Sequence, residues 1–228
     1  MSGRRAVGSA GGAGTYGTVL MAAEKPVVFV IDDDASVREA LEDLFHSIGM
    51  DVAAYGSAQE FQQAPRRDSP GCIVLDVRMP GQSGLEFQRT LADAKIFLPI
   101  IFISGHGDIQ MSVQAIKSGA IEFLTKPLHE QQLLDAVQAG LERDRARRED
   151  AKVVAELRQR YESLTPRERE VLALVITGLQ NKQIAAQLEL SEMTVKVHRS
   201  QLTRKMQART VIELVRMADR LGVAARRT

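Results

Sequence analysis

Apolar and polar positions follow two rhythms along residues 26–141. Short apolar runs that end at turn or polar residues occur at 27–31, 51–55, 72–75, 98–103 and 121–124, the second being the weakest. Such runs are typical of strands buried on both faces of a parallel sheet. Apolar residues at helical spacing lie between them, near 37–48, 83–93 and 109–118. Five strands alternating with five helices predict an α/β domain with a doubly wound, five-stranded parallel sheet.

The pattern then changes to helix alone. Residues 129–141 carry apolar side chains on one helical stripe, whereas 142–150 (ERDRARRED) mix charges of both signs with almost nothing apolar. That mixture is typical of a solvated helix, so a long, mostly exposed helix is predicted to join two domains across 142–161. A short coiled coil with a second copy is the alternative, and the gap in the apolar stripe disfavours it.

The segment 162–225 predicts an all-α domain of four helices. The first begins with a capping box, Thr165-x-x-Glu168, with Pro166 at the first helical position. The others are expected at 181–188, from Ser191 to Met206 and from Thr210 to Leu221. Two short helices joined by a tight turn, at 181–200, resemble a helix-turn-helix motif.

Charge separates the two predicted domains. The 228 residues carry a net charge of only +1, but residues 26–141 hold 16 Asp and Glu against 8 Lys and Arg, and 142–228 hold 12 against 19. A basic half beside an acidic half indicates that the second domain meets nucleic acid, with a membrane surface as the rival interpretation. No apolar run approaches the ~20 residues of a transmembrane helix, so a soluble, cytoplasmic protein is expected. The Gly- and Ala-rich residues 1–25 are expected to be a disordered tail, with Met1 or Met21 as the true start.

Polar residues follow four of the predicted strands. The parallel strands deliver their ends to one crevice, which would bring together Asp32, Asp33, Asp76, Ser104 and Lys126. Clustered carboxylates suit Mg²⁺, which prefers one or two carboxylates with water and phosphate oxygens. A further carboxylate can then attack phosphorus, while an ammonium and a hydroxyl neutralise the transferred group. The pattern predicts a site for phosphoryl transfer to an aspartate.

Two other classes of phosphate-handling protein fit less well. Haloacid-dehalogenase-type phosphatases use D-x-D, but Asp76 is followed by Val77 and Arg78. A flavodoxin-like domain would need a hydroxyl- and glycine-rich loop after the first strand, where this chain has three acids that would repel a flavin phosphate.

The third helix of the basic domain has two unlike faces. Winding residues 192–206 at 3.6 per turn places Val195, Leu202 and Met206 on the core side. Its outward face mixes two cations, a hydroxyl and apolar groups, which suits base edges and phosphates, although a solvated helical hairpin is the plainer alternative. The candidate DNA-contacting residues are Lys182, Thr194, Lys196, Val197, Arg199, Ser200, Arg204 and Arg209.

The motifs IDD, LDVRMPGQSG, ISGHGD and FLTKP closely resemble the receiver domain of two-component response regulators over residues 26–141. The resemblance implies that Asp76 is the phosphoacceptor and that Lys126–Pro127 is a cis peptide. The implied Mg²⁺ ligands are Asp32, Asp33, Asp76 and the backbone carbonyl of Arg78. The implied phosphoryl-binding and switch residues are Ser104, Lys126 and the aromatic Phe123.

The stretch LTPREREVLALVITGLQNKQIAAQLELSEMTVKVHRSQLTRKM resembles the LuxR-type helix-turn-helix domain, over about 162–225. Together the two halves resemble the NarL/FixJ family of bacterial response regulators. That resemblance implies a transcription regulator, not an enzyme, that is phosphorylated by a sensor histidine kinase and binds promoter DNA as a homodimer, with RNA polymerase as a further partner. A receiver used only as a protein-docking module, independent of phosphorylation, remains the alternative for the switch.

Overall fold

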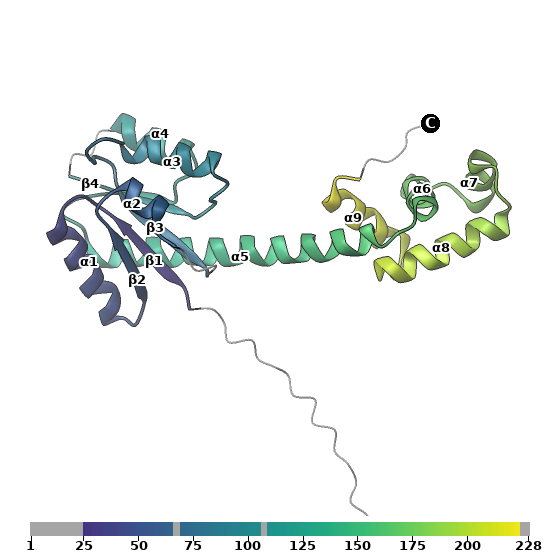
Figure 1. The fold of residues 1–228 in the computed structure, drawn as a ribbon, viewed down its shortest axis with the longest axis horizontal. Helices are drawn as coiled ribbons and strands as arrows, with labels where there is room; N and C mark the ends of the chain where they lie inside the picture. Colours follow the sequence, from purple (N-terminus) through teal and green to yellow (C-terminus); the bar gives the residue numbers. More distant parts are fainter. Residues whose placement is uncertain (1–24, 66–68, 106–108, 224–228) are drawn as a thin grey trace, which may run out of the picture.

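The computed structural model describes residues 25–65, 69–105 and 109–223. Residues 1–24 of the predicted tail, residues 106–108 of the GHGD motif and residues 224–225 of the predicted second domain therefore lie outside the described residues. The first body contains a parallel sheet in the order β2–β1–β3–β4–β5, which confirms the predicted α/β sheet (Figure 1). Its strands are β1 (Val27–Ile31), β2 (Asp51–Tyr55), β3 (Gly71–Asp76), β4 (Ile100–Ser104) and β5 (Glu122–Thr125).

Helices cover both faces of this sheet, as a parallel sheet requires. One face packs against α1 and the first part of α5, and the other face packs against α2, α3 and α4. The helices of this body are α1 (Ala35–Ser47), α2 (Ala58–Gln63), α3 (Gly84–Asp93), α4 (Ile109–Lys117) and α5 (Glu130–Glu162). The strand order reverses between β1 and β3, so the carboxyl ends of these strands flank the crevice where such folds bind ligands.

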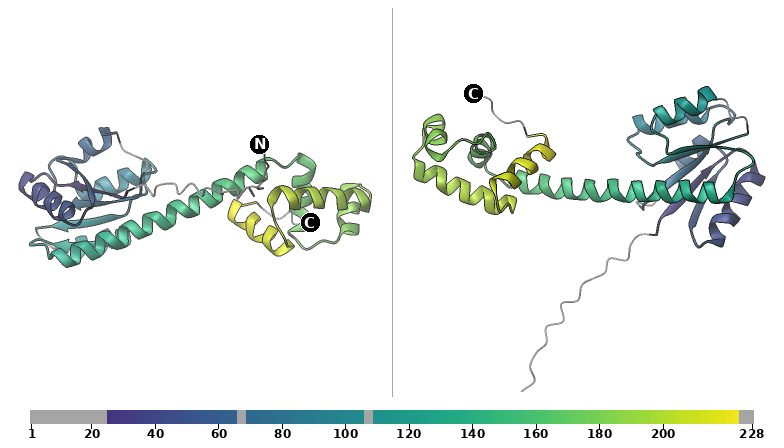
Figure 2. Two further views of the ribbon diagram at one scale, coloured as in Figure 1. Left: turned by 90° about the horizontal axis from the view of Figure 1, so that it is seen from below. Right: turned by 180° about the vertical axis from the view of Figure 1, so that it is seen from behind.

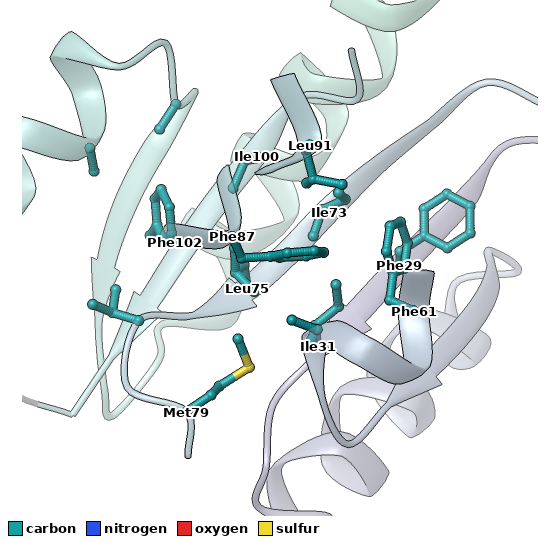
Figure 3. Close-up of a cluster of buried hydrophobic side chains, with 14 residues drawn as sticks. Phe29, Ile31, Phe61, Ile73, Leu75, Met79, Phe87, Leu91, Ile100 and Phe102 are labelled. Carbon is teal, nitrogen blue, oxygen red and sulfur yellow. The ribbon is translucent and has the colours of Figure 1, made fainter. Parts of the chain in front are cut away.

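Aromatic rings fill much of the core on the face beneath α2 and α3 (Figure 3). Phe61 is fully buried and meets the rings of Phe29, Tyr55 and Phe87 edge-on, with centroid distances of 5.3–5.8 Å. Edge-to-face pairs at this spacing are favourable beyond the area that they bury. They hold α2 against β1, β2 and α3, close to where the candidate site begins.

One strand is shorter than its apolar run predicted. The run begins at Leu98, but β4 begins at Ile100, because Pro99 has no N–H to offer the ladder. The carbonyl of Pro99 still accepts a 2.8 Å hydrogen bond from the N–H of Ile73. The strand is therefore entered from a proline and ends at Ser104, in the crevice.

The predicted connecting helix is confirmed as the second half of α5, a single helix of 33 residues. In both further views it runs from beneath the sheet to the C-terminal helices (Figure 2). Those helices are α6 (Pro166–Val175), α7 (Asn181–Leu188), α8 (Glu192–Met206) and α9 (Val211–Leu221). Across the described ranges, no helix combines the length and the apolar character needed to cross a membrane.

The caps expected in the C-terminal domain are present. Thr165 and Glu168 form the reciprocal capping box of α6, with Pro166 in its first turn. Ser191 caps α8 by accepting a 3.0 Å hydrogen bond from the N–H of Thr194. Glu189, in the turn before α8, has a φ of 54°, and this left-handed residue closes α7 sharply. The two helices of the predicted helix-turn-helix are thus set by local hydrogen bonds.

Candidate functional site

The structure brings together the polar residues that follow the strands. Asp32 follows β1, Asp76 ends β3, Ser104 ends β4 and Lys126 follows β5, all at the carboxyl edge of one sheet. Asp32, Asp76 and Ser104 are buried, and Lys126 is half-buried. Asp33 also lies at this edge, but its side chain is exposed.

Lys126 contacts both buried acids of the pocket. Its Nζ lies 2.7 Å from Oδ2 of Asp32 and 3.0 Å from Oδ1 of Asp76. Its backbone N–H donates a 2.8 Å hydrogen bond to the carbonyl of Ser104, which fixes the residue beside β4. The peptide bond between Lys126 and Pro127 is cis, as the resemblance implied. One ammonium group thus serves two carboxylates.

The pocket has too little positive charge for its buried acids. Asp32 is 1% exposed and Asp76 is 5% exposed, so neither carboxylate is well solvated by water. Burial raises the pKa of Asp76 above its ordinary value, against the hydrogen bond and the charge of Lys126. Burial alone would lower the pKa of Lys126, but its bonds to Asp32 and Asp76 outweigh that effect and raise it. Lys126 therefore stays charged, and its one ammonium group faces two buried carboxyl groups.

The loops around Asp76 hold its carboxylate in one orientation. The N–H of Arg78 donates a 2.6 Å hydrogen bond to Oδ2 of Asp76, while Oδ1 faces Lys126. Gly84 allows the next loop to close over the strand end, because a Cβ there would lie 2.5 Å from the carbonyl oxygen of Asp76. A β-carbon cannot be that close to a backbone oxygen, so this position requires glycine.

The donor set fits a divalent cation held partly by other ligands. Within the described ranges, no three His, Cys, Asp or Glu side chains converge into a ready-made cage. The carboxyl groups of Asp32 and Asp76 nevertheless face the same ammonium group, and Asp33 lies beside them on the exposed side. Mg²⁺ keeps several waters and takes only one or two carboxylates from a protein. The residues present suit that mode of binding.

Two neighbours of the site were not expected from the sequence. Asp34 had no assigned role, and it proves to be the N-cap of α1, accepting a 2.9 Å hydrogen bond from the N–H of Ser36. Arg38 reaches back one turn and donates to the carbonyl of Asp32 at 2.7 Å. An acid just before an amphipathic helix is a recognisable cap signal. No comparable signal points to Arg38, because its contact depends on the shape of the turn.

Phe123, the implied switch residue, lies at the edge of the aromatic core. Its ring is half-buried and packs at a tilt against Phe102, with 6.4 Å between centroids. It belongs to β5, two residues before the strand ends beside Lys126. The ring of Phe123 is thus packed against β4 through Phe102 but is not fully covered by protein.

A second candidate surface lies on α8. Val195, Leu202 and Met206 are buried in the core of the C-terminal domain, as the helical winding predicted. Met193 and Val197 are 69% and 48% exposed, an unusual placement for apolar side chains on a small domain. The polar candidates that share this exposure are Lys182, Lys196, Ser200, Arg204 and Arg209.

Two cations near this surface are held by the protein itself. Arg199 donates a 2.6 Å hydrogen bond from Nη1 to Oδ1 of Asn181, at the start of α7. Lys205 lies 2.7 Å from the carboxylate of Glu168, which belongs to the capping box of α6. Thr194 is half-exposed, and its hydroxyl lies 2.8 Å from that of Ser191. Lys205 therefore contributes less free charge to this surface than the exposed Lys196 does.

The fold and the two surfaces define a class of signalling protein: a receiver domain joined by a helix to a helix-turn-helix domain. The family model described as "Response regulator receiver domain" matches residues 28–138, and the one described as "Bacterial regulatory proteins, luxR family" matches 162–218. The chain belongs to the two-component response regulators of the NarL/FixJ family.

Individual relatives are similar in sequence to this protein over nearly the whole chain. Nodulation protein W of Bradyrhizobium diazoefficiens is 52% identical over 91% of both chains, and the transcriptional regulatory protein FixJ of Azorhizobium caulinodans is 44% identical over 86% of this chain and 93% of its own. Among solved structures, the response regulator StyR has a TM-score of 0.75 at 48% identity, covering 86% of this chain and 98% of its own. This protein is therefore a transcription regulator.

Proposed function

We propose that this regulator is switched by phosphorylation of Asp76 by a partner histidine kinase. The observation that carries the proposal is the buried pair Asp32 and Asp76, which share a single Lys126. Their excess negative charge favours a cation, and the fixed orientation of Asp76 leaves a carboxylate oxygen directed into the pocket. That oxygen would attack phosphorus, and the bond between phosphorus and the donor's histidine nitrogen would break.

Mg²⁺ is the cofactor that we propose for this step. Asp32, Asp33, Asp76 and the carbonyl of Arg78 would hold the cation, which would neutralise charge on the transferred group. Lys126 and the hydroxyl of Ser104 would take the remaining phosphoryl oxygens. Phe123 would then turn toward the space left by the moving loop and reshape the surface near α4.

Promoter DNA is the proposed target of the exposed face of α8. Helix α8 would enter the major groove with Lys196, Val197 and Ser200 at base edges, and the neighbouring candidates Lys182, Thr194, Arg199, Arg204 and Arg209 would help to position the backbone. Phosphorylation would promote a homodimer that binds two half-sites about one helical turn apart. RNA polymerase would be met at the promoter, in the cytoplasm.

The phosphoacceptor is tested by the intact mass of the protein after incubation with acetyl phosphate and Mg²⁺. The wild-type protein should gain one phosphate, and Asp76→Asn should gain none, because it keeps the shape and removes the nucleophile. Asp34→Asn is the matched control, since the side chain of Asp34 caps α1 and its backbone N–H, which bonds to Asp32, is unchanged, and it should be phosphorylated normally. A full adduct on Asp76→Asn would refute the assignment.

The switch is tested by DNA binding with and without the phosphate mimic beryllofluoride, together with the molar mass in solution. Tighter binding that accompanies dimer formation supports the proposal. Unchanged DNA affinity in protein that does take up the phosphate would favour a receiver used only for docking. Tighter binding by a protein that stays monomeric would replace the dimer with release of the C-terminal domain.

A further inference from the structure

Helix α5 loses its apolar packing between the two domains. Leu141 is the last of its residues in the core of the receiver domain, and Leu157 is the next apolar residue to be buried. Of the described residues between them, the one that is fully buried is an acid, Asp144, with 0% exposure. A charged side chain is rarely buried so completely unless strong partners surround it.

Both carboxylate oxygens of Asp144 are used. Oδ2 accepts a 3.1 Å hydrogen bond from the backbone N–H of Gly71 and a 2.7 Å bond from Nε of Arg148. Oδ1 accepts bonds of 3.0 and 2.7 Å from Nε and Nη2 of Arg147. The two guanidinium groups lie on α5 itself, so they compensate the charge, whereas the Gly71 bond joins the helix to the sheet.

The partner strand is the one that carries the phosphoacceptor. Gly71 is the first residue of β3, and Asp76 is its last. One turn earlier on α5, Gly140 lies so close to this strand that a Cβ would meet that of Cys72 at 3.0 Å. The helix therefore touches β3 at two successive turns, first by close packing and then by a directional bond.

We propose that Asp144 is the anchor that fixes the direction in which α5 leaves the receiver domain. Apolar packing alone lets a helix rock or slide against a sheet. The directional bond from the Gly71 N–H to the buried Asp144 carboxylate favours one arrangement of α5 against β3. The two arginines of α5 compensate the charge that this contact buries. The placement of the C-terminal domain at the far end of α5 then depends on this contact (Figure 1). The consequence for signalling rests on the proposed function. Phosphorylation of Asp76, at one end of β3, would affect α5 through the contact of Asp144 with Gly71 at the other end of the same strand.

The anchor is tested by electron–electron distance measurement on spin labels at Glu39→Cys, on α1, and Arg158→Cys, near the C-terminal end of α5, both exposed positions. Burial raises the pKa of the native Cys72 thiol to about 12, so that residue should resist labelling. Asp144→Ala removes the bond while keeping a residue that favours helix. Its distance distribution should be at least twice as broad as that of the otherwise unchanged labelled protein.

Glu142→Gln is the matched control. It removes the same charge two residues away, where Glu142 is exposed and its carboxylate accepts from Gln138 of the same helix. Its distribution should stay narrow, and a distribution equally narrow in Asp144→Ala would overturn the anchor. Should Asp144→Ala not fold, as judged by circular dichroism, Asp144→Asn takes its place. In that variant the distance distribution should broaden and the Gly71 amide should exchange faster than in the wild type, and no change in either would overturn the anchor.

A second measurement links the anchor to signalling. Asp144→Ala should still gain one phosphate from acetyl phosphate, but its DNA affinity should respond less to that phosphate than the wild type does. An undiminished response would show that the signal does not pass through Asp144. Failure of the wild type to respond would count against the proposed function instead, while the distance measurement, made without phosphate, would still decide on the anchor.

Discussion

Two buried carboxylates, one in each domain, lie against a lysine, and their surroundings differ in charge. Glu168 is 1% exposed and accepts hydrogen bonds of 2.7 Å from Lys205 and 2.8 Å from the N–H of Thr165. It has one cation to itself. Asp76 shares Lys126 with a second buried acid, Asp32.

The pKa values of the two acids move in opposite directions. Burial opposes the charged form of Glu168, but the bonds from Lys205 and Thr165 outweigh it, so its pKa lies below the ordinary value of 4.5. For Asp76 burial prevails, and its pKa lies above the ordinary value of 3.8. A balanced pair stabilises a fold, whereas an unbalanced one keeps a reactive group under strain that a ligand can relieve. We therefore expect Glu168 to stabilise the fold and Asp76 to act in the proposed phosphoryl transfer.

Removing the shared lysine should have the largest effect. Lys126→Met leaves two buried acids without a cation, so the free energy of unfolding at neutral pH should fall by about 3 kcal/mol when no divalent cation is present. Millimolar Mg²⁺ should restore part of the loss. Denaturant unfolding followed by circular dichroism measures both effects.

Lys117→Met makes the same change at an exposed position of α4, and it should alter stability little. Equal losses in the two variants would show that the buried acids of the receiver domain do not depend on Lys126. The loss in Lys126→Met should also shrink in acid, because the pKa of Asp76 is raised and its carboxylate is protonated there.

Neutralising Glu168 and neutralising Asp76 should have different effects on the free energy of unfolding. Glu168→Gln should destabilise the protein by about 2 kcal/mol at neutral pH, because the half-buried Lys205 loses its counterion. Asp76→Asn should cost nothing or stabilise slightly, since its ionisation is disfavoured by folding. Unfolding at pH 7 compares them directly, and a larger loss in Asp76→Asn would reverse the assignment.

The pH dependence follows from the same shifts. The folded pKa of Glu168 lies below its ordinary value, so its contribution is present above pH 4.5 and is lost as the pH falls through the folded pKa. The folded pKa of Asp76 lies above its ordinary value, so its ionisation subtracts stability as the pH rises through that range. Glu168→Gln should therefore lose its disadvantage in acid, and Asp76→Asn should lose its slight advantage there, because the wild-type Asp76 is then protonated too.

DNA binding should distinguish a free lysine from a paired one on the same helix. Lys196 is exposed on α8, whereas Lys205 is held by Glu168. Lys196→Ala should weaken the binding of a preferred site by about tenfold, and Lys205→Ala by much less per folded molecule. Titration of duplex DNA at several salt concentrations measures both. Equal losses would mean that Lys205 leaves Glu168 to reach the phosphates.

Strand ends could be read from the sequence because they follow from a regular topology. Once five apolar runs predict a parallel sheet, the residues after them must share one edge, which is why Asp32, Asp76, Ser104 and Lys126 were grouped correctly. The core side of α8 followed in the same way from its helical period.

Contacts that depend on how loops and helices are aimed could not be predicted. Arg38 reaches the carbonyl of Asp32 only because of the turn before α1, and Asp144 meets Gly71 across 73 residues of sequence. The charge pattern of 142–150 correctly predicted a helix, but it also made Asp144 look solvated. A buried acid within a charged segment gives no periodic signal, because its burial is decided by a neighbouring strand.

The smallest expected effect on stability concerns Asp34, the third of the three consecutive aspartates at 32–34. Asp34 caps α1 through the N–H of Ser36 and is exposed, so it has neither the burial nor the lysine that distinguish Asp32. Asp34→Ala should reduce the free energy of unfolding by about 1 kcal/mol, the usual effect of losing an N-cap. Asp34→Ser, which can still cap, should recover most of the loss. Both variants should take up phosphate from acetyl phosphate in full. A defect in phosphate uptake by both would show that the negative charge of Asp34 is needed in the pocket. Asp34 would then belong to the phosphorylation site together with Asp32 and Asp33.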